Sequence, residues 1–586
     1  MKKNIAPLVS VFAAFSLLAV SAPAGTPSVP APGSEGFEVS SAAVRAEPLG
    51  ASVCAELAPF SRHARDSVPA GDFSRAGAVP AWRGETVNFR FGVAAGRKPL
   101  KKLSYSARFA LKNASGATIS ATVSPVRWAV GQGGVQFADI VDAPGAPTSV
   151  PAGTLRELLV SVAVPADAAP GEYVGEFRAG ADGKKVFPVR VRVLAAKLPP
   201  PRERAVHLDL WQHPQAFARW AGVKPWTRAH FEAARGAMER LRDLGQKVVT
   251  CSIIEEPWGH QTYDDWESMV KWRRAADGSW SFDYSAFDAW TDFVVKEIGI
   301  DAQISCYSML PWSMKIGYAD KASGERKTLS LDIASPEFDE VWGAFLSDFK
   351  KHLAKRGLLE KTCIALDERP DAQLEAARRV VARFAPELKI VSANDHPTRM
   401  SDFVHDISPV FGHSGGDVPA LAEKRRAEGK KTTFYVCTQP ARPNTFTHSA
   451  PAEAHWLGFY AAANGFDGIL RWAYNSWNEN PFVTTAFGNW PAGDCFLIYP
   501  GNRSSMRLER LRDGLEDFEK IAVLRSRARE KSAPAALKKA VAELDEYLKR
   551  TFTVAAGGGN AHEAQTLRAI ELLDSAAFAA EKAGAQ

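Results

Sequence analysis

The chain has 586 residues, of which 46% are hydrophobic and 24% are charged, with 72 Lys and Arg against 66 Asp and Glu. This composition supports large buried cores and excludes a disordered or collagen-like protein. The formal net charge of +6 is small for this length and no long basic run occurs, so nucleic acid is not expected as a partner. At roughly 150 residues per domain, about three to four domains are expected.

The first residues have the pattern of a secretory signal peptide. The positive start Met1-Lys2-Lys3 precedes an apolar stretch from Ile5 to Val20, which is too short and wrongly flanked for a stable membrane span. Cleavage after Ala22 would leave a proline next to the cut, so cleavage after Ala24 is preferred. We predict a signal peptide over 1–24 and a flexible tether over 25–36. The mature chain should have no membrane span and be exported, either to the periplasm or out of the cell.

The six cysteines are widely spaced, and four of them lie inside apolar, strand-like runs. Buried thiols are therefore expected rather than a disulfide scaffold. No CxxC or HxxxH pair occurs, so the sequence predicts neither a metal site nor a cofactor.

Residues 37–198 show apolar side chains at every second position, for example along 87–93, 158–164 and 189–193. Turn signals rich in Gly and Pro separate these runs. Short alternating strands of this kind predict an N-terminal antiparallel β-sandwich. The segment 198–201, Leu-Pro-Pro-Pro, then predicts a stiff linker.

Residues 204–500 instead alternate apolar strands with amphipathic helices. The expected strands are 205–211, 247–254, 302–310, 362–366, 388–393, 407–411, 432–438 and 468–474. This pattern favours a central (β/α)8 TIM-like barrel. An open doubly wound sheet is the alternative, but no GxGxxG follows a strand and no P-loop is present. Residues 503–586 have helical periodicity and predict a C-terminal helical region packed on the barrel.

Polar and aromatic residues gather where the barrel strands end, which is where barrel enzymes build their sites. Indole rings stack on the apolar face of a pyranose, while amides and carboxylates bind its hydroxyls. Fourteen of the sixteen tryptophans lie after residue 200. The candidate sugar contacts are Trp211, His213, Asn394, His396, Tyr435, Trp472, Tyr474, Asn475 and Trp477.

The pair Asp367-Glu368 is the strongest catalytic candidate because it ends a buried strand. A structural salt bridge with Arg369 is the alternative interpretation. Neighbours on a regular strand point to opposite faces, so a turn or bulge must bring the two carboxyls together. The seventh strand ends in residues 437–440, Cys-Thr-Gln-Pro, without a carboxylate. A missing protein nucleophile is expected if the substrate supplies its own through a 2-acetamido group.

Four motifs, CIALDERP, GILRWAYNSWNENP, GDCFLIYPG and SMRLERLRDGLEDFEKI, make the chain resemble glycoside hydrolase family 123 over nearly its whole mature length. The resemblance implies an exo-acting, retaining β-N-acetylgalactosaminidase that forms an oxazoline intermediate without a metal. The substrate would be a glycan or glycolipid that ends in β-linked N-acetylgalactosamine. Glu368 would be the general acid/base, Asp367 would orient the acetamido group, and residues after the last strand would form the sugar pocket.

Two other functions stay open at this point. One is another glycosidase that uses Glu255 or Glu256 as its second carboxylate. The other is a carbohydrate-binding protein without catalytic activity. Hydrolysis of a β-N-acetylgalactosaminide, compared with its gluco epimer and with a galactoside that lacks the acetamido group, separates the three.

Overall fold

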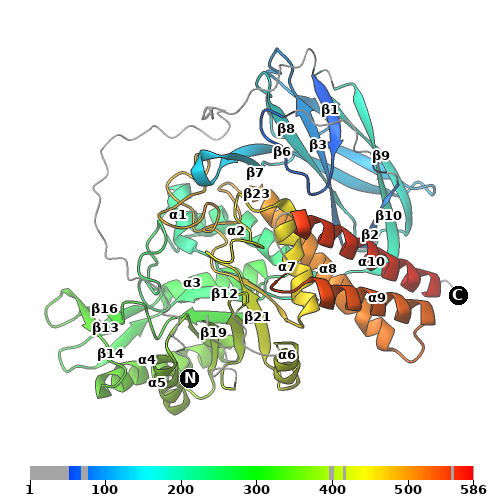
Figure 1. Cartoon of the computed structure of the whole chain (residues 1–586). Coiled ribbons are helices and arrows are strands. Elements are labelled where there is room, and N and C mark those ends of the chain that lie inside the picture. The colour runs from blue at the N-terminus through cyan, green and yellow to red at the C-terminus, as the bar shows by residue number, and fades with distance from the viewer. Residues whose placement is uncertain are drawn as a thin grey trace, which may run out of the picture. The chain divides into compact units, whose positions relative to one another are not determined.

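The structure is a computed structural model that describes residues 52–67, 75, 77–181, 183–394, 402–412, 418–555 and 560–584. The predicted signal peptide, the tether and His396 lie outside these residues. A β-rich N-terminal region, a nearly closed parallel barrel and a helical C-terminal tail follow one another along the chain (Figure 1). This is the order predicted from the sequence.

The β-rich region forms one sheet with the strand order β1-β3-β8-β6-β5-β9-β10-β2, and every pair on this path is antiparallel except β10–β2. Its strands are β1 (Val53–Leu57), β2 (Val79–Arg83), β3 (Thr86–Ala94), β4 (Ser104–Tyr105), β5 (Arg108–Lys112), β6 (Thr118–Val130), β7 (Gln136–Val141), β8 (Leu155–Ala163), β9 (Gly171–Gly180) and β10 (Lys185–Lys197). The apolar positions of the period-two runs are buried together, and the rings of Phe91 on β3 and Phe177 on β9 lie 4.6 Å apart. Strands that are distant in the sheet order therefore share one core.

All eight expected barrel strands are present and parallel, in the order β11-β22-β21-β20-β19-β18-β15-β12. They are β11 (His207–Leu210), β12 (Val248–Ser252), β15 (Gln303–Tyr307), β18 (Thr362–Leu366), β19 (Lys389–Asn394), β20 (Asp406–Pro409), β21 (Lys431–Tyr435) and β22 (Gly468–Arg471). The two ends of the sheet meet at an isolated parallel bridge between Leu208 and Gln246. This bridge nearly closes the barrel, which rules out an open doubly wound sheet.

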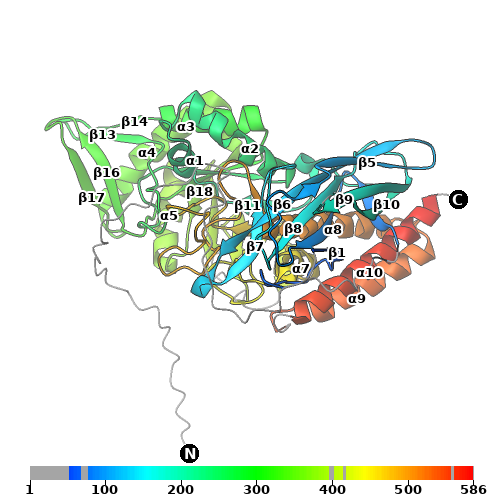
Figure 2. The same ribbon diagram turned by 90° about the horizontal axis from the view of Figure 1, so that it is seen from above.

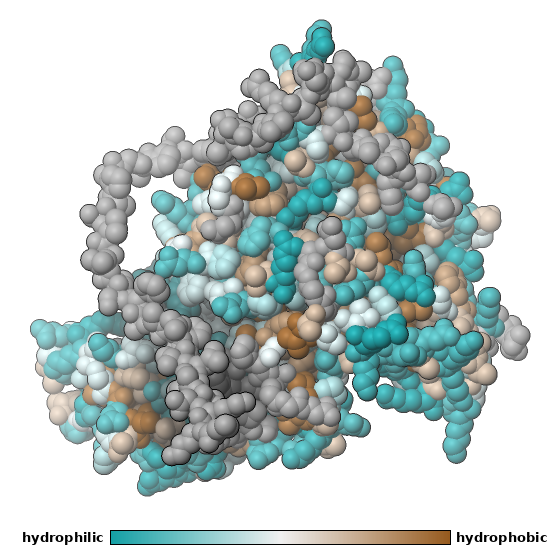
Figure 3. Space-filling view, in the orientation of Figure 1, coloured by the Kyte–Doolittle hydropathy of each residue, from teal (hydrophilic) through white to brown (hydrophobic). Residues whose placement is uncertain are grey.

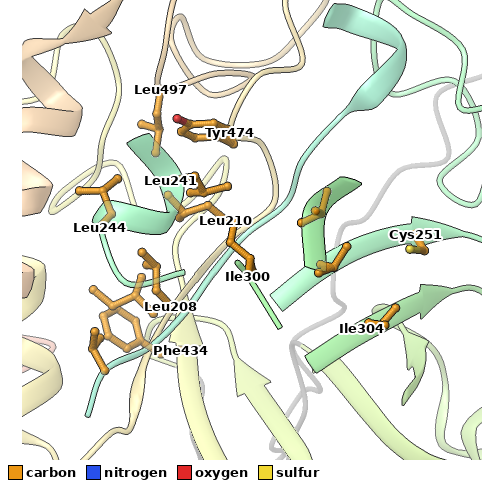
Figure 4. Close-up of a cluster of buried hydrophobic side chains, with 14 of the residues drawn as sticks. Leu208, Leu210, Leu241, Leu244, Cys251, Ile300, Ile304, Phe434, Tyr474 and Leu497 are labelled. Atoms are coloured by element: carbon orange, nitrogen blue, oxygen red, sulfur yellow. The ribbon is translucent and has the colours of Figure 1, made fainter. Parts of the chain in front are cut away.

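Helices cover the outside of the barrel. They are α1 (Pro214–Ala221), α2 (Arg228–Asp243), α3 (Ser285–Thr291) with the π-helical turn η3 (Asp292–Ile298), α4 (Pro336–Arg356), α5 (Asp371–Phe384), α6 (Val418–Ala427) and α7 (Pro451–Ala463). Three single turns of 3-10 helix are η1 (Gln132–Gly134), η2 (Pro201–Glu203) and η4 (Leu359–Lys361). Outward-facing strand residues such as Leu208, Ile304 and Phe434 join the helices in one large hydrophobic core (Figure 4).

Two hairpins that the sequence analysis did not predict form a second, small sheet with the order β14-β13-β16-β17. The hairpins are β13 (Lys271–Arg274) with β14 (Trp280–Asp283), and β16 (Lys315–Asp320) with β17 (Arg326–Ser330). They belong to the loops that follow β12 and β15, and the sheet lies next to α4 (Figure 2).

The C-terminal tail consists of the short strand β23 (Ser504–Ser505) and the helices α8 (Met506–Arg529), α9 (Ala535–Thr551) and α10 (Asn560–Gly584). Helix α8 packs on α7 of the barrel so closely that a Cβ on Gly458 would lie 2.1 Å from the Gly514 carbonyl oxygen. Glycine is therefore needed at this crossing. Among the described residues, no helix combines the length and apolar character needed to cross a membrane. Hydrophilic residues predominate on the face shown in Figure 3.

Candidate active site

Asp367 and Glu368 lie together at the mouth of the barrel, the end where the carboxyl ends of the strands meet. Strand β18 ends at Leu366 and the chain bends at Glu368. Ala365 belongs to a buried cluster inside the barrel, so Asp367, two residues on, continues its inward face. The Tyr435 hydroxyl, from β21, donates a hydrogen bond to Glu368 Oε1. Both carboxyls therefore lie at this end of the barrel, close enough for the charge of Glu368 to act on Asp367.

Burial and the neighbouring charge of Glu368 raise the pKa of Asp367 from 3.8 to about 7. The Arg369 guanidinium, the Glu368 backbone N–H and the Trp312 indole N–H act in the opposite direction and favour the carboxylate. Two adjacent carboxyls in a desolvated site cannot both ionise easily, which is why the charge of Glu368 disfavours the Asp367 carboxylate.

Arg369 does more than balance the acidic pair. Its Nε donates to the Leu310 carbonyl at 3.0 Å, and its guanidinium carbon lies 5.2 Å from the centre of the Trp312 ring. The indole of Trp312 is 41% exposed. Arg369 and Trp312 thus form the rim of the site on the side of the β15 loop.

A buried aromatic cluster lies at the same end of the barrel, formed by Trp211, Trp258, Trp266, Tyr307 and Tyr435 at the carboxyl ends of strands and in the loop after β12. The Trp211 ring lies 4.9 Å from that of Trp258 and 4.6 Å from that of Tyr307. Trp258, Trp266 and Tyr307 were not among the predicted sugar contacts, and Trp266 does not follow a strand directly. It lies within the long loop after β12, where Glu256 Oε1 accepts its backbone N–H at 2.5 Å.

The structure brings several predicted sugar contacts to this cluster. Trp211 and Tyr435 are members of it, and the half-buried Trp472 packs against it. His213 is fully buried and stacks on Trp266 at 4.0 Å, and burial lowers the pKa of its imidazole to about 3. Asn394 is buried at the end of β19.

Asn475 has a different position. Its side chain accepts the His213 backbone N–H and donates to the His213 carbonyl, both at 2.9 Å. It therefore clamps the loop after β11.

Tyr474 and Trp477 are not brought to the cluster. Tyr474 donates to the Ala237 carbonyl at 2.9 Å and lies among core residues near Leu241 and Leu497 (Figure 4). Trp477 is buried in the same core and donates to the Ile498 carbonyl at 2.7 Å. Strand β22 ends at Arg471, so the strict alternation expected along 471–477 has no strand to maintain it.

Glu255 and Glu256, the alternative second carboxylates, are engaged elsewhere in the loop after β12. Glu255 forms an ion pair with Arg326 of β17. Glu256 accepts the backbone N–H of His260 at 2.7 Å as well as that of Trp266. Glu256, His260 and Asp265 place potential metal-ligand atoms within 4.8 Å of one another, but the imidazole and Asp265 are exposed to solvent. The geometry thus favours Asp367 and Glu368 as the reacting pair.

A parallel barrel with two adjacent carboxyls next to an aromatic cluster at its mouth has the architecture of a glycoside hydrolase. The family model described as "Glycoside hydrolase 123, catalytic domain" matches residues 211–524, more than half of the chain. The chain therefore belongs to glycoside hydrolase family 123.

Solved structures support the same fold. A family 123 glycoside hydrolase from Clostridium perfringens, studied for glycolipid glycan hydrolysis, has a TM-score of 0.83 and 24% identity, with 91% of this chain and 100% of that chain covered. A maltogenic α-amylase from Thermotoga neapolitana has a TM-score of only 0.30 at 12% identity, with 57% of this chain and 78% of that chain covered. This similarity is too low to indicate a shared fold. No curated protein matches the sequence.

Proposed function

We propose that the protein is an exo-acting, retaining β-N-acetylgalactosaminidase that removes terminal β-linked N-acetylgalactosamine from glycans or glycolipids. The observation that supports the proposal is that Asp367 and Glu368 follow β18 at the barrel mouth, where Glu368 contacts Tyr435 of the aromatic cluster. Membership of family 123 and the glycolipid glycan studied with the Clostridium enzyme support the choice of substrate.

The proposed mechanism uses the substrate's own acetamido group as the nucleophile. Glu368 gives its proton to the leaving oxygen while the acetamido oxygen attacks the anomeric carbon. Asp367, as an anion, accepts the acetamido N–H and stabilises the positive charge that develops on the oxazoline ring. Glu368 then takes a proton from water, which opens the ring from the face that the leaving group left. Two inversions give a product with the β configuration retained.

Three nitrophenyl glycosides test this function directly. The protein should hydrolyse the β-N-acetylgalactosaminide faster than the gluco epimer, and it should not hydrolyse the β-galactoside that lacks the acetamido group. Equal hydrolysis of the galactoside would contradict substrate assistance. Binding without hydrolysis of any of the three would favour a carbohydrate-binding protein.

Trp472 and Trp477 separate contact with the sugar from packing in the core. Trp472→Ala should raise KM, or lower kcat/KM, by about tenfold, because the half-buried indole beside the aromatic cluster loses its sugar contact. Trp477→Ala should instead destabilise the fold by about 3–5 kcal/mol and leave KM nearly unchanged, because its ring is 2% exposed. Kinetics and thermal melting on both variants check this. Unchanged KM with a lowered Tm in Trp472→Ala would assign that residue to the core as well.

We also propose that the protein is exported by cleavage of residues 1–24. The support is the charged start, the apolar run and the small residues before Gly25. N-terminal sequencing of protein from the native host should find a mature chain that begins near Gly25, in the periplasm or the medium. An intact Met1 on that protein would refute export by this route.

A further inference from the structure

The β-rich N-terminal region reaches the active-site loops through a buried ion pair. Strand β23 of the tail pairs with β7 of the N-terminal sheet, and the two lie side by side in Figure 1. Next to this junction, Arg507 at the start of α8 donates through Nε to both carboxylate oxygens of Asp139 on β7, at 3.1 and 3.0 Å. The Tyr499 hydroxyl donates to Asp139 at 2.6 Å. The Arg507 and Asp139 side chains are only 6% and 3% exposed.

The same guanidinium holds two loops at the barrel mouth. Arg507 Nη1 lies 2.9 Å from each of three backbone carbonyls, those of Thr445, Gly493 and Phe496. Thr445 belongs to the loop after β21, and Gly493 and Phe496 belong to the loop after β22. The rigid, many-donor geometry of a guanidinium suits this role, because it fixes several acceptors relative to one another.

Trp472 is tied to the second of these loops. Asp494, next to Gly493, is fully buried and accepts the Trp472 indole N–H at 3.1 Å. Asp494 also accepts from Arg471 at 2.7 Å, and Arg471 Nε donates to Thr445 Oγ1 at 3.0 Å. A continuous buried chain of polar contacts therefore runs from β7 to the indole that packs on the aromatic cluster. In such a network the loss of one charge is felt by its neighbours.

We propose that Asp139 and Arg507 are positioning residues of the active site, through which the β-rich region fixes the loop that holds Trp472 in place. This assigns the N-terminal region to the catalytic unit rather than to a separate binding module. The proposal rests on the function proposed above only in taking Trp472 as part of the sugar site.

A second ion pair between the same two regions provides a matched control. Lys520 of α8 contacts Glu85, which lies between β2 and β3, at 2.6 Å, with side chains 7% and 10% exposed. Its other partner is Asp517, which is bonded to His455 of α7. Within the described part of the chain, the hydrogen bonds and ion pairs of the Glu85 and Lys520 side chains involve only Trp82, Asp517 and each other, and none of these belongs to the loops after β21 and β22. The loss of this pair should therefore affect stability alone.

The test compares Asp139→Asn with Glu85→Gln in the full chain, by thermal melting and by kinetics on whichever of the three nitrophenyl glycosides the wild type cleaves. Both variants should lower Tm, because each removes a buried carboxylate charge from the cation it is paired with. Asp139→Asn should also raise KM about five- to tenfold, whereas Glu85→Gln should leave KM within about twofold. Unchanged KM in Asp139→Asn, or an equal rise in both variants, would overturn the proposal. If the enzyme does not prefer substrates with an acetamido group, the proposed function is wrong, but this test can still be made with the glycoside that is cleaved. The proposed function and the positioning role can therefore be refuted independently.

Two further variants keep the test decisive if Asp139→Asn does not fold. Tyr499→Phe removes only the hydroxyl that donates to Asp139, and it should raise KM about two- to threefold. In a Trp472→Phe background, which lacks the N–H to Asp494, this rise should shrink, because both changes act through one chain of contacts. Fully additive effects, or no effect of Tyr499→Phe on KM, would contradict positioning through Trp472.

Discussion

Glu368→Gln is expected to lower kcat by about 10²–10⁴-fold on substrates with poor leaving groups, such as an N-acetylgalactosamine-terminated disaccharide. The glutamine keeps the size of the side chain and can still accept from the Tyr435 hydroxyl, but it cannot supply a proton to the leaving oxygen. The loss should be much smaller on a nitrophenyl glycoside, because nitrophenolate leaves with little protonation. Steady-state kinetics on both substrates give the ratio of the two losses.

Glu340→Gln is the matched control for this variant. Glu340 also follows an aspartate, but it is exposed on α4, so its change should leave kcat and Tm unaltered. Equal losses on the two substrates by Glu368→Gln would argue against an acid role for Glu368. In that case the carboxyl would act by charge or by contact rather than by proton transfer.

The barrel strands could be predicted from the sequence because each is a short apolar run between helical segments. Strands buried on both faces leave this signal whatever their neighbours are. The start of a helix is also determined by nearby residues. At the start of α4, for example, the Ser335 hydroxyl accepts the Phe338 backbone N–H at 3.3 Å. The carboxyl pair was predictable for a related reason. It stands directly after such a run, where parallel strands converge on one edge.

Features that depend on distant partners could not be predicted. The small sheet forms because β13 pairs with β16 from a different loop. Neither hairpin contains an apolar run that would predict a strand from the sequence. Tyrosine is a residue type expected in a sugar site, yet the hydroxyl of Tyr474 donates to the Ala237 carbonyl on α2. Trp266 reaches the aromatic cluster only because the loop after β12 folds back onto Glu256. In each case a contact between residues that are not close neighbours in the sequence decides the outcome.

Asp367→Asn is expected to lower kcat by about 10²-fold or more and to weaken a thiazoline inhibitor by a similar factor. A thiazoline in the galacto configuration is a stable mimic of the oxazoline ring, so it should inhibit competitively and more tightly than the product sugar. Asp367 as an anion would accept the N–H of the protonated ring nitrogen in both the intermediate and the mimic. Asparagine keeps the shape of the side chain but not its charge, so both effects should fall together. Inhibition constants and kcat for wild type and variant provide the comparison.

The proposed mechanism, together with the raised pKa of Asp367, predicts a pH dependence of kcat/KM. The reaction needs one proton on the pair, with Glu368 as donor and Asp367 as anion once the acetamido N–H is bound. Because the pKa of Asp367 is raised to about 7, this last proton is lost above that pH, and kcat/KM should fall on the alkaline side. Arg369 lowers the pKa of Asp367, so Arg369→Met should move this limb to higher pH. An alkaline limb at the same pH in Arg369→Met would show that the charge of Arg369 does not control the pKa of Asp367.

The stereochemistry of the product is the strictest test of the role given to Asp367. Attack by the acetamido oxygen and then by water inverts the anomeric carbon twice, so early-time NMR should show the β anomer of N-acetylgalactosamine. An inverted product would require a water activated by a carboxylate on the opposite face of the sugar. Glu255 and Glu256 would then be the candidates, although Glu255 is paired with Arg326 and Glu256 holds two backbone N–H groups. A retained product combined with full activity of Asp367→Asn would refute Asp367 as the group that stabilises the oxazoline ring.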